Sequence, residues 1–358
     1  MKDLKFAIIG AGAGGQSMAA ILAQEGYIVK LHDNNQATID RLNKLGEIKI
    51  TGAIEAVATP EIITTDITAA VDDVNVIMIV TTTDGHRDVA NKISPLLHDG
   101  QIIMLNPGHL GGALEITNII RESGCKAELI IAEAGDLMYA CRVIEVGHIF
   151  HSGLKSETKV ATLPGKDIDK LIEVLKPVFS NIVAAQNVLY TGLEAGGAML
   201  HPIPTLMNLN RIDSGQPFDY YMEGITPSVA KLIEVADEER LAVCTALRVK
   251  LPSLITNLQR IYKLTQDDLY ELLQNNKAYV GVKSPKDLRH RFVVEDTVSG
   301  LVPLSSLGKQ LGVPTPMIDA FIKIGSVASG HDYFEEGRTV EKLGLADKTI
   351  EEIYRYIS

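Results

Sequence analysis

The chain has 358 residues, 46% of them hydrophobic, and its 34 basic and 45 acidic side chains leave a net charge of −11. This balance excludes an intrinsically disordered protein, and the acidic sum disfavours a nucleic acid or an anionic membrane as a partner. Three cysteines are too few for a disulfide framework, and no apolar run is long enough for a signal peptide or a transmembrane helix, so we expect a cytoplasmic protein.

The first half of the chain alternates short apolar strands with amphipathic helices. A helix is expected over 16–24, and strands over 5–9, 27–32, 74–81, 101–105 and 129–132. Strands separated by helices predict an α/β domain with a parallel, doubly wound sheet. Residues 140–163 are β-rich and are expected to add antiparallel strands, before a last α/β pass over 168–190.

No strong strand signal follows residue 190, which predicts an all-helical second half. Thr226-Pro227 and Thr315-Pro316 each place a capping residue before a proline, a typical helix start. Further helices are expected after a cap at Thr191 and over 251–261, 266–273 and 339–345. We therefore place an α/β domain at 1–185 and a helical domain at 186–358, whose apolar helices offer a face for a homodimer.

A glycine-rich turn follows the first expected strand. Gly10, Gly12 and Gly15 form the pattern G-x-G-x-x-G where the first helix opens. In a dinucleotide site, the first glycine permits the tight turn, the second lets the backbone approach a pyrophosphate, and the third allows close helix–strand packing. The alternative is a turn that merely needs flexible residues, but the strand–turn–helix context favours a cofactor site.

Asp33 ends the second expected strand, 18 residues after Gly15. An acidic side chain at this place meets the adenosine ribose hydroxyls of a bound dinucleotide. The following residues, Asn34 and Asn35, offer no cation for a 2′-phosphate. We therefore expect NAD rather than NADP; the alternative for Asp33 is a solvated turn residue or a helix cap.

Two polar or glycine-rich loops follow later strands. One is Thr81-Thr82-Thr83, and the other runs from Asn106 through His109 to Gly112. Doubly wound sheets bind ligands at the carboxyl ends of their strands, so these loops are candidates for contact with cofactor and substrate. Plain loop chemistry remains the alternative.

A histidine stands beside two prolines in His201-Pro202-Ile203-Pro204. A proline inside a helix breaks it, and a histidine at such a break, just past the domain boundary, is a candidate acid–base group. From the residues alone, a buried core histidine is the favoured interpretation. No metal site is expected, because metal-ligand spacing is absent among the other candidates His109, His148, His151 and His290.

Two arginines and a carboxylate pair lie in the segment 289–296. Arg289 and Arg291 could clamp a substrate carboxylate, and Asp296 could orient a histidine. A surface salt-bridge cluster with a helix cap is the favoured interpretation from these residues alone.

The whole chain resembles the opine dehydrogenases, the octopine/nopaline dehydrogenase family, and most of all their bacterial branch. The most specific stretches are LNPGHLGGALE (105–115), the pair Cys141-Arg142, MLHPIPTLMN (199–208), FDYYMEGITPSV (218–229), FVVEDTVSGLVPLSSLGKQLGVPTP (292–316) and GRTVEKLGL (337–345). The resemblance implies a Rossmann-type domain followed by a helical domain. It also implies NADH-dependent condensation of an α-keto acid with the amino group of an amino acid, through an imine.

The resemblance also assigns roles to individual residues. His201 takes the place of the catalytic histidine, Asp296 that of its partner, and Arg291 that of the arginine for the substrate carboxylate. Cys141 and His109 are expected at the substrate. His109 stands where smaller residues are usual in this branch, which suggests a change in the local shape of the pocket.

Other functions stay open on the sequence alone. Hydroxyacid, ketopantoate and glycerol-3-phosphate dehydrogenases have a similar two-domain build, and several use a lysine in the first interdomain helix. No lysine lies between Asn187 and Arg211 of this chain, which favours histidine chemistry. A non-catalytic NAD-binding sensor is the remaining alternative.

Overall fold

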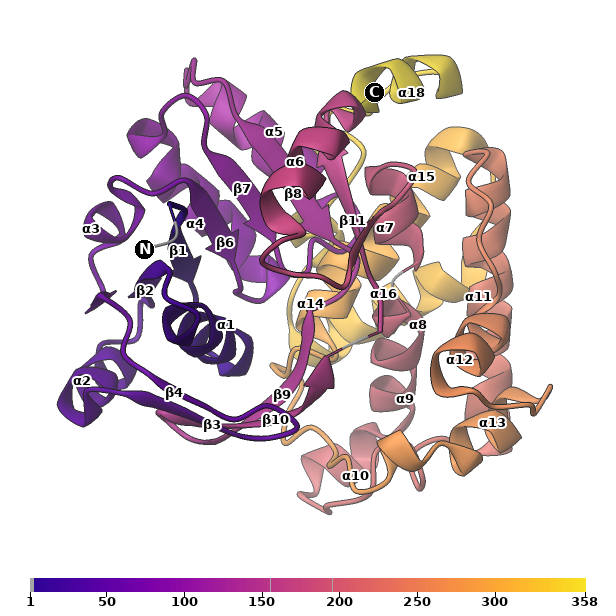
Figure 1. The fold of residues 1–358 in the computed structure, drawn as a ribbon. Helices are drawn as coiled ribbons and strands as arrows, with labels where there is room; N and C mark the ends of the chain where they lie inside the picture. The colour runs from indigo at the N-terminus through magenta and orange to yellow at the C-terminus, as the bar shows by residue number, and fades with distance from the viewer. Residues whose placement is uncertain (1–2, 155, 195) are drawn as a thin grey trace. The chain divides into compact units, whose positions relative to one another are not determined.

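The computed structural model describes residues 3–154, 156–194 and 196–358. The chain forms two compact units: Met1–Thr191 together with Glu351–Ser358, and Gly192–Ile350 (Figure 1). The break lies six residues after the expected boundary at 185/186.

The first unit is built on an eight-stranded sheet with the order β12-β11-β8-β7-β6-β1-β2-β5. All neighbours are parallel except β11 and β8, as a doubly wound sheet with an antiparallel addition requires. The strands are β1 (Lys5–Ile9), β2 (Ile28–His32), β5 (Ile62–Thr64), β6 (Val76–Ile79), β7 (Ile102–Leu105), β8 (Ile130–Ala134), β11 (Thr158–Leu163) and β12 (Ile182–Ala184). The predicted fold class of this half is confirmed.

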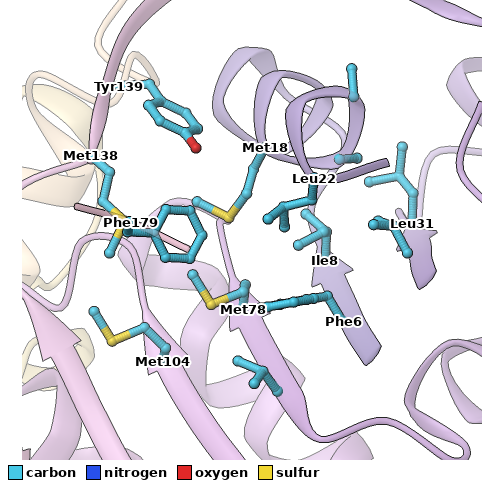
Figure 2. Packing of buried hydrophobic residues seen from close by; sticks show 14 of the residues in the cluster. Phe6, Ile8, Met18, Leu22, Leu31, Met78, Met104, Met138, Tyr139 and Phe179 are labelled. Carbon is cyan, nitrogen blue, oxygen red and sulfur yellow. The ribbon is translucent and has the colours of Figure 1, made fainter. Parts of the chain in front are cut away.

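Helices of the first unit pack on this sheet through apolar faces. Met18 and Leu22 of α1 lie over Ile8 of β1 and Met78 of β6 in the core (Figure 2). The α-helices are α1 (Ala13–Gln24), α2 (Gln36–Leu45), α3 (Ile67–Val71), α4 (His86–Ile93), α5 (Gly112–Glu122), α6 (Ile168–Leu175) and α18 (Ile350–Ile357). Helix α7 (Val188–Glu194) crosses the break between the units.

A second, four-stranded sheet in this unit has the order β4-β3-β10-β9. Its strands are β3 (Ile48–Gly52), β4 (Ala56–Ala58), β9 (Tyr139–Glu145) and β10 (His148–Leu154). We expected 140–163 to extend the main sheet, but only β11 joins it; β10 pairs instead with β3, about 100 residues earlier. Such a long-range pairing leaves no local signature in the sequence, and β3 and β4 were not predicted.

The second unit is helical, and an isolated bridge between Asp219 and Lys283 is its only β-structure among the described residues. Thr226 caps the longest helix by accepting the N–H of Val229, as its sequence predicted. The helices are α8 (Gly197–Leu200), α9 (Pro202–Met207), α10 (Leu209–Asp213), α11 (Pro227–Ala246), α12 (Leu254–Tyr262), α13 (Leu269–Asn275), α14 (Val294–Asp296), α15 (Val302–Leu311), α16 (Pro316–Ser329) and α17 (Tyr333–Glu336).

Two expected helices differ from the structure. Thr191 is no cap: it lies inside α7, where its hydroxyl donates to the carboxylate of Glu133 and to the carbonyl of Val188. Short helices follow it instead of a long one. Residues 340–344 form turns: one helical hydrogen bond joins the N–H of Leu343 to the carbonyl of Thr339, and Gly344 then takes a left-handed φ of +68°, which ends the helical path.

The C-terminal helix α18 belongs with the first unit, although we expected residues up to 358 in the helical domain. The hydroxyl of Tyr356 donates to the side-chain oxygen of Asn118 at 2.6 Å. The carbonyl of Ser358 accepts the N–H of Lys166. These polar contacts tie the end of the chain to helix α5 and to the segment before α6.

Candidate active site

The glycine loop leaves open space at the N-terminus of α1. Gly10 has a φ of +111°, and a Cβ there would lie 2.8 Å from the carbonyl oxygen of Val80. A Cβ on Gly15 would lie only 1.7 Å from the carbonyl oxygen of Gly10, whereas one on Gly12 would meet nothing within 4 Å. No side chain caps the helix at Gly12. The loop therefore suits a pyrophosphate, because free helical N–H groups and open space coincide there.

Asp33 lies against this loop. Its Oδ2 accepts the N–H of Ala11 at 2.6 Å, and its Oδ1 accepts the N–H of Asn35 at 2.8 Å. These two hydrogen bonds hold the half-buried carboxylate at the place where the ribose hydroxyls of a bound dinucleotide are expected. A cation that the local sequence did not reveal lies close by: Lys92 Nζ is 3.4 Å from Asn34, but it is already paired with Asp88 at 2.7 Å.

Thr81 follows β6 and Asn106 follows β7, at the edge of the sheet where the glycine loop follows β1. The main-chain nitrogen of Thr81 is 3.1 Å from the position of a Cβ on Gly10. Asn106 is buried, and its N–H donates to the carbonyl of Ile79 at 2.8 Å. Both residues therefore stay candidates for contact with the cofactor.

The loop that contains His109 is organised by Glu133, which sequence reasoning missed. The Oε2 atom of this buried carboxylate accepts the N–H of Ala113 at 2.8 Å, and Oε1 accepts the Thr191 hydroxyl at 2.6 Å. A Cβ on Gly108 would lie 2.6 Å from the Glu133 side chain. Its sequence signal was weak, a single acidic residue inside an apolar strand. His109 itself is nearly buried and has a φ of +54°.

Cys141 lies on β9, opposite His151 of β10. Burial raises the pKa of its thiol, so the group stays protonated at neutral pH. The partly buried side chain packs against the hydrophobic core of the first unit, and this environment disfavours a nucleophile.

His201 and Asp296 form a hydrogen-bonded pair in the second unit. Nδ1 of His201 lies 2.8 Å from Oδ2 of Asp296, although the residues are 95 positions apart. The Asp296 side chain is 1% exposed and the His201 side chain 16%. The predicted proximity is confirmed, and the base–orienter geometry suits general acid–base chemistry.

The local fold explains this proximity. His201 follows α8, where its N–H donates to the carbonyl of Gly197, and precedes α9, where its carbonyl accepts the N–H of Thr205. Pro202 is the first residue of α9 and has no N–H with which to continue α8. Asp296 ends α14 immediately before a π-helical turn, Thr297–Leu301. A Cβ on Gly300 in that turn would lie 2.6 Å from Cβ of Ala198, so small residues let α8 approach it closely.

Aromatic rings surround the histidine. Phe292 stacks on the His201 ring with centroids 4.0 Å apart. The hydroxyl of Tyr221 lies 3.2 Å from Nε2, and that of Tyr220 donates to the carbonyl of His201. Sequence reasoning did not single out these tyrosines, although both lie in the family-like stretch 218–229.

The two candidate arginines have different surroundings. The Arg291 side chain is 55% exposed, lies 3.5 Å from the carboxylate of Glu295, and stands over the ring of Phe292. Arg289 is 85% exposed and pairs with Asp287. Arg291 thus shares a neighbour with His201, whereas Arg289 belongs to a surface ion pair.

The sequence-predicted candidates form two groups, each within its own unit. Gly10, Gly12, Gly15, Asp33, Thr81 and Asn106 lie in the first unit, as do His109 and Cys141, whereas His201, Asp296 and Arg291 lie in the second. Among the described residues no cluster of histidine, cysteine or carboxylate side chains could hold a metal. None of the helices in the described part of the chain has the length and apolarity that crossing a membrane requires.

Comparison with known proteins identifies the family. The α-helical domain of the NAD/NADP octopine/nopaline dehydrogenases matches residues 184–329, and the N-terminal part of NAD-dependent glycerol-3-phosphate dehydrogenase matches residues 5–123. An opine dehydrogenase from Arthrobacter sp. (strain 1C) is 39% identical over 345 residues, 96% of each chain.

Solved structures share the fold. An octopine dehydrogenase with NADH and L-arginine superimposes with a TM-score of 0.79 at 19% identity, covering 98% of each chain. A yersinopine dehydrogenase with NADP+ superimposes with a TM-score of 0.76 at 16% identity, covering 98% of this chain and 99% of that one. Since the Arthrobacter enzyme matches nearly the whole length at 39% identity, the chain belongs to the opine dehydrogenase family.

Proposed function

We propose that this member of the family, an NAD(P)-dependent oxidoreductase with small-molecule substrates, condenses an α-keto acid such as pyruvate with the amino group of an L-amino acid. The product is an N-(carboxyalkyl)amino acid. The observation that carries the proposal is the bond between His201 Nδ1 and Asp296 Oδ2. Family membership supplies the reaction class.

His201 moves the protons of the condensation. Because Nδ1 faces the carboxylate of Asp296, Nε2 is the atom that exchanges a proton with substrate. Nε2 of His201 protonates the keto oxygen while the amine adds to the carbonyl carbon, and the product of this addition is a carbinolamine. A second protonation of that oxygen releases water and leaves the imine, while the nitrogen gives up the protons that balance the step. Asp296 keeps the ring in one orientation throughout.

Arg291 binds the carboxylate of the keto acid. Its guanidinium is half exposed, so it can accept a ligand without losing the contact to Glu295. An arginine can pair with a carboxylate through two parallel hydrogen bonds, which fixes the direction of the neighbouring carbonyl. Cys141 and His109 complete the proposed substrate contacts.

The dinucleotide binds at Gly10, Gly12 and Gly15, with Asp33 on the ribose and with Thr81 and Asn106 nearby. Bound NADH supplies the hydride that reduces the imine. The open space at Gly12 supports this site. The carboxylate of Asp33 favours ribose hydroxyls and would repel a 2′-phosphate, which supports NADH over NADPH.

We also propose that the enzyme is cytoplasmic. It forms a homodimer through its helical unit. The exposed apolar residues Ile324 and Val327 on α16 support the dimer face. Light scattering distinguishes a dimer from the 38.8 kDa monomer.

The decisive experiment is a matrix of L-amino acids against pyruvate and related keto acids, followed by loss of NADH absorbance at 340 nm. Condensation requires both substrates together. Consumption of NADH with the keto acid alone would instead indicate a hydroxyacid-type dehydrogenase. Binding of NADH without turnover in every combination would indicate a sensor.

A further inference from the structure

Both ring nitrogens of His201 have a partner. Nδ1 lies 2.8 Å from Asp296 Oδ2, and Nε2 lies 3.2 Å from the hydroxyl of Tyr221. The nitrogen that must meet the substrate is therefore the one beside the phenol. Whatever oxygen binds at Nε2 also comes within reach of Tyr221.

The position of this hydroxyl is set by its own neighbours. The Tyr221 ring stacks on Tyr279 with centroids 4.0 Å apart and planes 13° apart, and it meets Tyr220 edge-on. The side-chain amide of Gln274 donates to the carbonyl of Tyr221. These contacts hold the phenol near His201 without help from its bond to the imidazole.

The phenol is a donor and not a base. Burial raises the pKa of Tyr221 above its ordinary value, the nearby Tyr262 and Asp296 raise it further, and only Arg291 opposes them. The group therefore keeps its proton at neutral pH. When Nε2 is unprotonated, the hydroxyl donates to it, and Nδ1–H donates to Asp296.

Two donors this close can serve one acceptor. An oxygen about 2.8 Å from each donor atom, a common hydrogen-bond length, forms a triangle with the 3.2 Å side between Nε2 and the hydroxyl. Converging donors aimed at an oxygen that gains negative charge are the essential feature of an oxyanion hole.

We propose that Tyr221 is a catalytic residue that donates a hydrogen bond to the keto oxygen bound at Nε2 of His201. It stabilises the negative charge that develops on this oxygen as the amine adds to the carbonyl carbon. No bond to Tyr221 forms or breaks: the proton that ends on the oxygen comes from His201, and the phenol keeps its own. The inference rests on the proposed condensation.

The test is Tyr221→Phe, which removes the hydroxyl and keeps the stacked ring. Loss of one such donor typically lowers kcat about 10²-fold or more, and a bond that strengthens in the transition state affects kcat more than KM. We expect this loss with the Kd of NADH and the Tm unchanged. The matched control is Tyr262→Phe, the same change in a tyrosine whose ring lies against Tyr279, with turnover within about twofold of wild type.

Proton NMR of the Nδ1–H···Asp296 signal separates a catalytic from a merely positional role. Loss of turnover with this signal intact supports the inference, whereas loss of both would mean that Tyr221 only holds His201, which overturns it. Near-normal turnover of Tyr221→Phe overturns it as well and leaves the condensation standing. Absence of condensation in the wild type overturns the proposed function itself.

Discussion

Gly197 leaves the space that the carboxylate of Asp296 occupies. A Cβ at position 197 would lie 2.5 Å from Oδ1 of Asp296 and 3.3 Å from Nδ1 of His201. The first distance is too short for any real contact. A glycine is therefore required here by the close approach of a side chain from another helix, and the pair His201–Asp296 depends on it.

Gly197→Ala should displace Asp296 and lower kcat by about 10–10²-fold, since small misplacements of catalytic groups have effects of this size. Gly196→Ala is the matched control, because a Cβ there meets only Leu254 at an ordinary 3.4 Å. Steady-state kinetics of both variants measures the difference. Equal activity of the two would show that the approach of Asp296 is not critical.

His201→Ala should lower turnover by at least about 10²-fold, the typical contribution of a positioned acid–base group. The Kd of NADH should stay unchanged, because the glycine loop and Asp33 are untouched. Asp296→Asn should also slow turnover, through the wrong imidazole tautomer. If the His201→Ala variant kept a nearly normal kcat, His109 would become the next candidate for the acid–base group.

Two glycines of the loop should respond differently to alanine. In Gly15→Ala the methyl group collides with the carbonyl of Gly10, and we expect overpacking to cost about 1–3 kcal/mol of unfolding free energy. In Gly12→Ala the added methyl group has no protein atom within 4 Å, so the Tm should stay near that of the wild type. The Kd of NADH should rise, because the methyl group occupies the space proposed for the pyrophosphate. Thermal melts and fluorescence titration measure both. Normal NADH binding by Gly12→Ala would argue against a pyrophosphate at this turn.

The wild type should have a lower KM for NADH than for NADPH, because Asp33 carries a negative charge where a 2′-phosphate would lie. Asp33→Ala should raise the KM for NADH and reduce this preference, since it removes both the ribose acceptor and the contact to Ala11. Initial rates with each cofactor test this. A wild-type preference for NADPH would mean that Lys92, beside Asn34, outweighs Asp33.

The free energy of unfolding should fall as the pH falls below about 6.5. Burial lowers the pKa of His32 beneath the ordinary value of 6.5, and the charge of Asp33 only partly opposes this. Between the two pKa values the unfolded chain binds a proton that the folded chain does not, so acid favours unfolding. Thermal melts from pH 7.5 to 5.5 should show a smaller slope for His32→Asn than for wild type. An unchanged slope would exclude His32 as a contributor.

Several features follow from local sequence. Continuous apolar runs at 5–9 and 74–81 produce buried strands because no polar residue interrupts them. The glycine spacing and the Thr226-Pro227 cap are short-range patterns with a direct backbone meaning. The pairing of His201 with Asp296 came from resemblance to a family, since the residues alone favoured a core histidine and a surface ion pair.

Other features depend on contacts between distant segments. Three examples are the pairing of β10 with β3, the bond from the N–H of Ala113 to the carboxylate of Glu133, and the contact between the Tyr221 hydroxyl and Nε2 of His201. In each of them the two partners come from different segments of the chain. Spacing rules describe neighbours on one element and carry no information on which elements meet. By itself, the amino-acid sequence determined most strands of the main sheet, the Thr226 cap and the cofactor turn. Only tertiary packing decided which side chains surround the histidine, because that depends on how closely the small residues Gly197 and Gly300 let their helices approach.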